Sequence, residues 1–337
     1  MKPLRKIIAA LDVWQRRTRG VGVPYAVVKK FGDDNANLQV LALAWYGFTA
    51  IFPLLLVVVT VLGFIGQASL GTGVVTALQK FPVIGSSFPK NPSGSNSLHG
   101  STIGLVIGLI GLIYGAQGVT QSAQQAMATV WNVPQTQFTG FVPRLGRSLA
   151  GLVIIGGSFL INALLSTYVT GGTSNYAIRV PILVGLVIIN SALYFAAFYV
   201  LTPKVVGARG LIPGAILGSI GFTALLTVGT GLLTHQLKNA SNTYGTFGGV
   251  IGIVTILLLL AKVSIYAAEL NPVLARKLYP RALPMVDDPT NADFQVLIDL
   301  SHAQQRRKDQ VIGVGFGVNG VADAAADAGK QAKQRPS

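Results

Sequence analysis

Acidic residues are almost absent from the middle of this sequence: no Asp or Glu occurs between Asn35 and Ala268. The first acid after this gap is Glu269, the only glutamate in the chain. A soluble domain of that length would carry charges of both signs on its surface. Charged residues make up 11% of the chain, apolar residues 51%, and the mean hydropathy is +0.57. These values predict a polytopic membrane protein.

Cysteine is also absent, which excludes disulfides and thiolate metal sites. The three histidines (His99, His235 and His302) are isolated, and the acid-free core offers no carboxylate cluster to hold catalytic metal ions. We therefore expect no enzyme: no catalytic residue, no metal site, no cofactor and, in particular, no ribonuclease activity.

Six apolar stretches are long enough to cross a hydrocarbon core of about 30 Å, which takes roughly 20 helical residues. They are Leu41–Gly66, Thr102–Val130, Leu149–Val169, Val180–Leu201, Leu211–Leu233 and Phe247–Leu270. The stretches lack the alternation of barrel strands, and backbone groups in lipid must be hydrogen-bonded within the segment. The predicted fold is therefore all-α, a bundle of six transmembrane helices in residues 39–275.

Basic residues are distributed unevenly between the two sides of this bundle. Of the 26 Lys and Arg, 21 fall on the side of the termini and 4 on the opposite side. This bias predicts that both termini of the multi-pass protein lie in the cytoplasm, at the inner or plasma membrane. Because the basic residues flank spans, we expect the net charge of +15 to attract membrane lipids with anionic headgroups, and we expect no nucleic-acid partner.

Two polar segments flank the predicted bundle. Residues 1–38 form a basic, partly amphipathic arm, which ends in Asp33, Asp34 and neighbouring residues suited to capping the next helix. Residues 276–337 form a polar cytoplasmic tail, predicted to be flexible, with a short helix around 291–308. Inside the bundle, glycine pairs such as Gly111 with Gly115 and Gly214 with Gly218 favour close helix packing.

Glutamines mark one face of the second span. Gln117, Gln121, Gln124 and Gln125 recur at helical spacing, so their amides share a face. Amides facing lipid are costly, so this face is expected to point at a wet cavity or at polar partners on other helices. The alternative is that the lower glutamines already lie at the membrane interface.

The last span contains two charged residues. Lys262 and Glu269 are seven residues apart, so they lie on one helical side about 10 Å apart along the axis. Lys262 either snorkels to the interface or serves an anionic-substrate or proton path. Glu269 is expected to pair with Arg276 or a loop arginine. The candidate cavity or substrate residues are thus Gln117, Gln121, Gln124, Lys262 and Glu269.

Several motifs occur in the order of a known family. The first span contains Ala42-Leu-Ala-Trp-Tyr-Gly-Phe-Thr-Ala-Ile-Phe-Pro-Leu-Leu-Leu56. The others are Thr129-Val-Trp-Asn-Val-Pro134, Tyr199-Val-Leu-Thr-Pro-Lys204 leading to Pro213-Gly-Ala215, Tyr244-Gly-Thr-Phe-Gly-Gly-Val250 and Ala267-Ala-Glu-Leu-Asn271. Over roughly residues 40–275 the chain resembles the YihY/BrkB family of six-helix inner-membrane proteins, long mislabelled ribonuclease BN.

The resemblance implies a six-span fold and a role in the cell envelope in which transport is suspected, without an established substrate or catalytic residue. Lys262 departs from the family pattern. We therefore expect a transporter or a permease that handles lipids or anions through a cytoplasm-facing polar cavity. The alternative is a non-transporting membrane scaffold for envelope assembly or integrity. A homo-oligomer is compatible with either function.

Overall fold

The computed structural model describes residues 2–65, 102–137, 143, 146–151, 153–158, 176–203, 206–225, 246–284 and 289–315. Every regular element in this part of the chain is helical. The named elements are α1 (Lys2–Arg17), α2 (Arg19–Asp33), α3 (Ala36–Ile65), α5 (Thr102–Val130), η2 (Gln135–Gln137), α7 (Tyr176–Leu201), η3 (Ala208–Leu211), α9 (Thr246–Ala275) and α10 (Asn291–Ala303). Helical residues also occur at 146–151, 153–158 and 212–225. The all-α prediction is confirmed for the described residues.

Four helices in the described part are long and apolar enough to cross a membrane. They cover Leu105–Val130, Leu183–Leu201, Ala208–Leu225 and Val250–Ala275, and a shorter apolar helix covers Ala36–Ile51. Large apolar side chains are exposed along them, for example Ile110, Ile188 and Ile251. Such a surface is unfavourable in water and suits lipid. Of the third predicted span only residues 149–151 and 153–158 are described, and the ends of several other spans lie outside the described residues.

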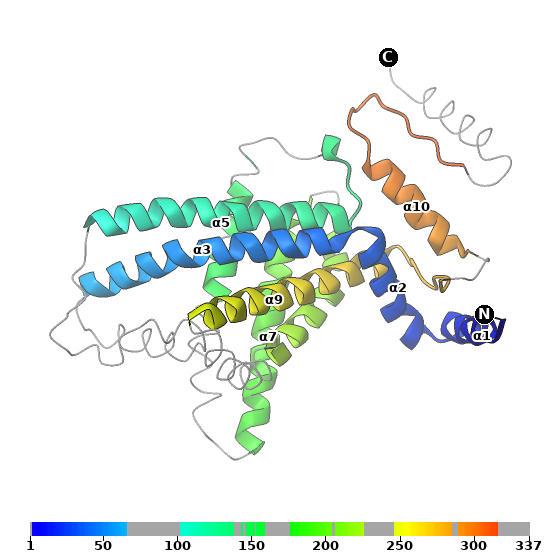
Figure 1. Ribbon diagram of the computed structural model, residues 1–337, viewed down its shortest axis with the longest axis horizontal. Coiled ribbons are helices and arrows are strands. Elements are labelled where there is room, and N and C mark those ends of the chain that lie inside the picture. Colours follow the sequence, from blue (N-terminus) through cyan, green and yellow to red (C-terminus); the bar gives the residue numbers. More distant parts are fainter. Residues whose placement is uncertain are drawn as a thin grey trace.

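Helices α3, α5 and α9 run along one another, and α7 crosses them (Figure 1). Glycines bring α5 against α3: a Cβ at Gly115 would lie 3.0 Å from the Cα of Ala50, and one at Gly118 would lie 2.3 Å from the ring of Tyr46. The close approach explains why α3 and α5 form the most extensive helix contact.

Residues 212–225 pack against α9 in the same way. A Cβ at Gly214 would lie only 2.2 Å from the carbonyl oxygen of Ala267, and one at Gly221 would lie 2.7 Å from Val263. The Gly214 amide also donates to Asn271 Oδ1 at 2.7 Å. The prediction that Gly214 and Gly218 permit close packing is therefore confirmed.

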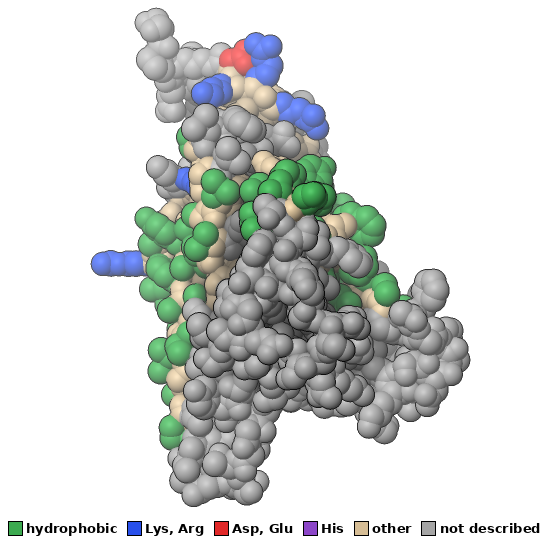
Figure 2. Space-filling model, turned by 90° about the vertical axis from the view of Figure 1, so that its left-hand side faces the viewer, with side chains coloured by type: hydrophobic (Ala, Val, Ile, Leu, Met, Phe, Trp, Pro, Cys, Tyr) green, Lys and Arg blue, Asp and Glu red, His purple; other side chains and the backbone are tan. Residues whose placement is uncertain are grey.

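At one end of the long helices, α1, α2 and α10 gather together with the segment 276–284 (Figure 1). We call these elements the charged end. In Figure 2 basic side chains gather mainly at one end of the molecule, and apolar side chains cover much of the described surface along the helices. Part of the predicted tail is thus folded, since α10 lies inside the range 291–308 where a short helix is predicted.

Replacing Gly214 by Ala tests the close approach of residues 212–225 to α9. The new methyl group would meet a backbone carbonyl, which cannot move without shifting the helix. We expect a loss of about 1–3 kcal/mol in stability, seen as a lower melting temperature of the detergent-purified protein. Gly185→Ala is the matched control, because a Cβ at Gly185 has no atom within 4 Å. Equal melting of the two variants would contradict the packing.

Candidate functional site

The described structure places three charged side chains in contact with one another beneath the charged end. Lys30 comes from α2, Asp34 from the turn after it, and Glu269 from the last two turns of α9. All three side chains have 0% exposure. We call Lys30, Asp34 and Glu269 the ion triad. It ties the segment before the first span to the end of the last one.

The Lys30 ammonium is the centre of the triad. It donates to a carboxylate oxygen of Asp34 and to the carbonyl oxygen of Val130 at 2.8 Å, and it lies 3.1 Å from Glu269 Oε2. Two of the three N–H groups of the ammonium thus donate hydrogen bonds, to Asp34 and Val130, while Glu269 is held by the ion pair. Burial alone would lower the pKa of Lys30, but Glu269 and Asp34 raise the pKa above its ordinary value, so the side chain stays charged.

The end of α5 supplies a neutral partner. Asn132 has φ 50. The backbone amides of Asn132 and Val133 donate to the carbonyl oxygens of Thr129 and Ala128, respectively. This is the left-handed helix ending that asparagine tolerates. The turn directs Asn132 Nδ2 to Asp34 Oδ1 at 3.1 Å. The sequence predicts that Asp34 and its neighbours cap α3. In the structure, the carboxylate of Asp34 instead accepts hydrogen bonds from Lys30 of α2 and from Asn132 after α5.

Several buried polar atoms near the triad have no hydrogen-bond partner among the described residues. They are Glu269 Oε1 and Oε2, Asn132 Oδ1, Asn271 Nδ2 and Trp131 Nε1. Glu269 thus contributes an ion pair to Lys30 without a well-aligned hydrogen bond. Buried polar groups are normally satisfied, and exceptions often mark places where a ligand or proton binds. In the described part of the chain, no group of three His, Asp or Glu is placed to hold a metal ion.

The predicted glutamine face is half-buried. Gln117, Gln121 and Gln124 all have intermediate exposure, whereas the fully buried face of α5 carries Thr120 and Ala126. Gln124 Nε2 donates to Ser148 Oγ at 3.4 Å, so this glutamine has a polar partner on another helix. The glutamines do not reach the ion triad through any described contact.

The two charged residues of α9 have different environments. Lys262 is exposed, while Glu269 is fully buried, although the two lie on one side of the helix. The difference arises because α2 packs against α9 near its end and covers Glu269. The predicted pairing of Glu269 with Arg276 is wrong. Arg276 pairs instead with Asp299 of α10 at 2.8 Å, and its guanidinium lies over the ring of Trp131.

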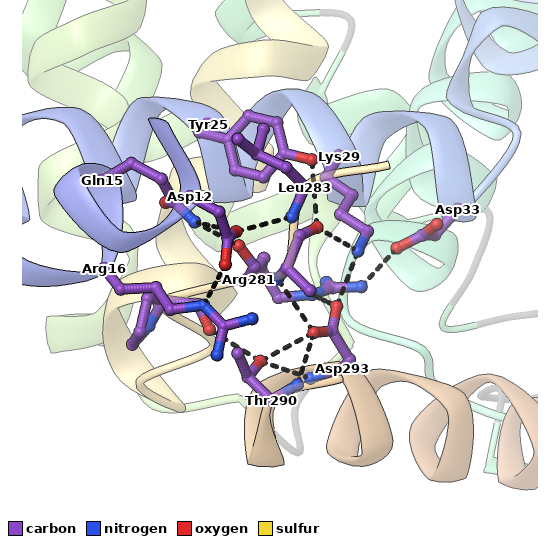
Figure 3. A network of polar contacts seen from close by, with 12 residues as sticks. Asp12, Gln15, Arg16, Tyr25, Lys29, Asp33, Arg281, Leu283, Thr290 and Asp293 are labelled. Atoms are coloured by element: carbon purple, nitrogen blue, oxygen red, sulfur yellow. Dashed lines mark hydrogen bonds and ion pairs between the residues drawn. The ribbon is translucent and has the colours of Figure 1, made fainter. Parts of the chain in front are cut away.

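A second polar cluster joins α1, α2, the segment 276–284 and α10 (Figure 3). Arg281 is its centre: Nε donates to Asp293 Oδ1 at 2.6 Å and Nη2 to Asp33 Oδ2 at 2.7 Å. Lys29 reaches the same Asp293 oxygen at 2.8 Å, and Gln15 Nε2 donates to the Arg281 carbonyl oxygen at 2.5 Å. We call this cluster the arm–tail clamp.

Asp293 is the most heavily bonded group of the clamp. Its carboxylate accepts hydrogen bonds from Lys29, Arg281 and the amides of Ala282 and Thr290, and Thr290 and Asp293 form a capping box at the start of α10. Burial would raise the pKa of Asp293, but these donors hold the pKa well below its usual range.

The ion triad was not predicted from the sequence. Lys30 and Asp34 were assigned to a basic arm and a helix cap, and nothing in their local pattern points to a residue beyond position 260. One signal was available, since Glu269 is the only glutamate and lies in the motif Ala267–Asn271, while Asn132 lies in the motif Thr129–Pro134. The structure brings these two motifs to the same place.

Removing Lys30 should be the most damaging change in the triad. Lys30→Gln leaves Asp34 and Glu269 buried without a cation, which is expected to cost about 3–5 kcal/mol. Glu269→Gln should cost less, because the Lys30–Asp34 pair remains. Melting of the detergent-purified variants measures both effects. Lys29→Gln is the control from the next position, with 27% side-chain exposure; equal melting of Lys29→Gln and Lys30→Gln would contradict the buried pairing.

The clamp should weaken in acid. The pKa of Asp293 is lower in the folded protein than in the unfolded chain. The ionised carboxylate therefore contributes its full share of folding stability at a pH above the unfolded pKa of about 4, and this contribution is lost as the pH falls toward the folded-state pKa. Asp293→Asn should remove this pH dependence and raise amide exchange in α10 at neutral pH. Hydrogen-exchange mass spectrometry measures both, with Asp299→Asn, which removes a carboxylate of the same helix outside the clamp, as the control. Unchanged protection of α10 in Asp293→Asn would show that the clamp does not hold this helix.

The comparisons with known proteins agree with the motifs. The profile of the family described as virulence factor BrkB matches residues 27–288. This region includes all three members of the ion triad and Lys29, Asp33 and Arg281 of the clamp, but neither α1 nor α10 with Asp293. No individual curated protein and no solved structure matches the chain. Since the match covers most of the sequence, the chain belongs to the BrkB family of membrane proteins.

Proposed function

We propose that the protein is a multi-pass permease of the inner or plasma membrane that handles an anionic substrate or lipid and serves the cell envelope. The observation that carries the proposal is the ion triad, in which three charged side chains are fully buried at the end of a membrane-spanning helix. Ionisable residues in such positions are costly, and they mark substrate or ion paths by default. The proposal assigns no enzymatic reaction.

A purely structural role accounts less well for the triad. Buried ion pairs can often be replaced by apolar side chains without loss of stability. Here two carboxylates share one ammonium, so a negative charge is in excess. Uptake of one proton or binding of one cation would neutralise it. The unpartnered atoms of Glu269, Asn132 and Asn271 supply further groups that such a step can use.

The proposed orientation places both termini and the charged end in the cytoplasm. The bias of Lys and Arg toward the side of the termini supports it. The clamp adds support, because it bonds α1 and α2 directly to the segment 276–284 and α10. An even number of spans, six in the proposal, keeps these segments on one side.

A scaffold for envelope assembly is the second candidate, and one observation favours it. Two cavities of about 340 and 460 Å³ in the described structure are lined by residues of the charged end, by residues that follow α5 and by residues that follow α10. Neither is lined by Gln117, Gln121 or Gln124. A scaffold needs no path through the bundle, and the clamp would give it a rigid cytoplasmic surface.

Lipid movement in reconstituted vesicles tests the permease. Wild-type protein in vesicles should expose inner-leaflet phosphatidylglycerol, labelled with a nitrobenzoxadiazole group, to external dithionite faster than vesicles without protein. Glu269→Gln should slow this movement about tenfold, equivalent to about 1.4 kcal/mol in the barrier. Asp299→Asn is the control, because it neutralises a carboxylate that also pairs with a cation but lies outside the spans.

Two outcomes would contradict the permease. Equal rates for the wild type and Glu269→Gln, at equal reconstitution, would remove the triad from the mechanism. A wild-type rate no higher than that of protein-free vesicles would favour the scaffold.

A further inference from the structure

The charged end contains a basic cavity beside the arm–tail clamp, with which it shares Gln15. It measures about 460 Å³ and lies between the end of α1, the start of α2 and the residues that follow α9. Arg16, Arg17, Arg19 and Lys277 line it together with Tyr279. Four cations around one cavity create a strongly positive potential.

Most of these cations have no ionic partner in the described structure. Arg16 pairs with Asp12 at 2.6 Å. Arg17, Arg19 and Lys277 are exposed and form no ion pair with a described residue. Four other cations of the charged end, Lys29, Lys30, Arg276 and Arg281, all contact carboxylates. The contrast indicates that the cavity is arranged for an anion from outside the protein.

Two local backbone features place the cations. Lys277 has φ 55 just after the end of α9. The backbone amides of Lys277 and Leu278 donate to the carbonyl oxygens of Leu274 and Val273, so the helix ends here and the side chain of Lys277 points away from α9. Helix α2 begins at Arg19 with no acidic residue in its first turn and no side-chain cap. Its first amides therefore add partial positive charge on the side of the cavity.

The neighbouring surface of α1 identifies the kind of anion. Leu11 and Trp14, three residues apart on one side of α1, are exposed to 50% and 54%, and Trp14 lies one turn before Arg17. An amphipathic helix with exposed Trp and Leu beside Arg is typical of segments that lie in the plane of a membrane interface. A soluble anion would need the cations but not this apolar face.

We propose that this cavity binds the phosphate-bearing headgroup of an anionic phospholipid, with α1 in the membrane interface beside it. The inference rests on the proposed function in so far as it names the lipid class that the permease would receive at its cytoplasmic face. The binding site itself stands on the cavity, its unpaired cations and the apolar face of α1.

Native mass spectrometry of the full-length protein in detergent tests the site, with added phosphatidylglycerol and, in a separate arm, phosphatidylcholine. We expect phosphatidylglycerol to bind more tightly than phosphatidylcholine. Arg17→Gln combined with Arg19→Gln should weaken phosphatidylglycerol binding about tenfold or more, because each juxtamembrane cation contributes to anionic-lipid affinity. Arg306→Gln combined with Lys308→Gln removes the same charge from exposed positions beyond α10 and should bind as the wild type does.

The contradicting results are distinct. Equal weakening by both double variants would indicate general charge attraction and overturn the site. Trp14→Ser should also weaken binding; if it does not, and inorganic phosphate displaces phosphatidylglycerol, the cavity takes a soluble anion and the lipid assignment fails. Should the Arg17/Arg19 variant fail to fold, Lys277→Asn, which tolerates φ 55, must show the loss instead. Lipid binding without lipid movement would overturn only the proposed function.

Discussion

A buried charge must be paired, and this constraint organises the end of the bundle. The ammonium of Lys30 lies where α2, α5 and α9 meet, and each of these elements or its adjoining turn supplies it with an acceptor. Without those acceptors the desolvation of Lys30 would be prohibitive. The position of α2 against α9 therefore follows from the triad as much as from the apolar contacts of Ala26 and Val27 with Val273.

The motifs that place the chain in its family have a structural explanation at this same point. Asn132 holds Asp34, Asn271 holds the Gly214 amide, and Glu269 holds Lys30. Two motifs thus supply three polar side chains to the junction of helices: Thr129–Pro134 supplies Asn132, and Ala267–Asn271 supplies Glu269 and Asn271. The glycine at 214 is required because the Ala267 carbonyl occupies the space of a side chain.

Hydropathy was sufficient to predict the all-helical fold and the approximate position of each described span, because lipid imposes length and composition on a helix. It could not predict the ion triad. Asp34 and Glu269 are separated by almost the whole bundle in sequence, so their meeting depends on how the helices pack. Helical spacing placed Lys262 and Glu269 on one side of α9, but it could not show that α2 covers only the second of them.

The basic residues of the charged end fall into two groups with different physical consequences. Lys29, Lys30 and Arg281 are bonded to carboxylates within the protein, and the burial of Lys30 shields its contacts from dissolved ions. Arg17, Arg19 and Lys277 face outward, where attraction to an anionic membrane surface weakens as ionic strength rises. A rise in salt therefore reduces the second set of interactions while the first persists. The cations that hold the fold are thus distinct from those of the proposed lipid site, although both sets lie in the charged end.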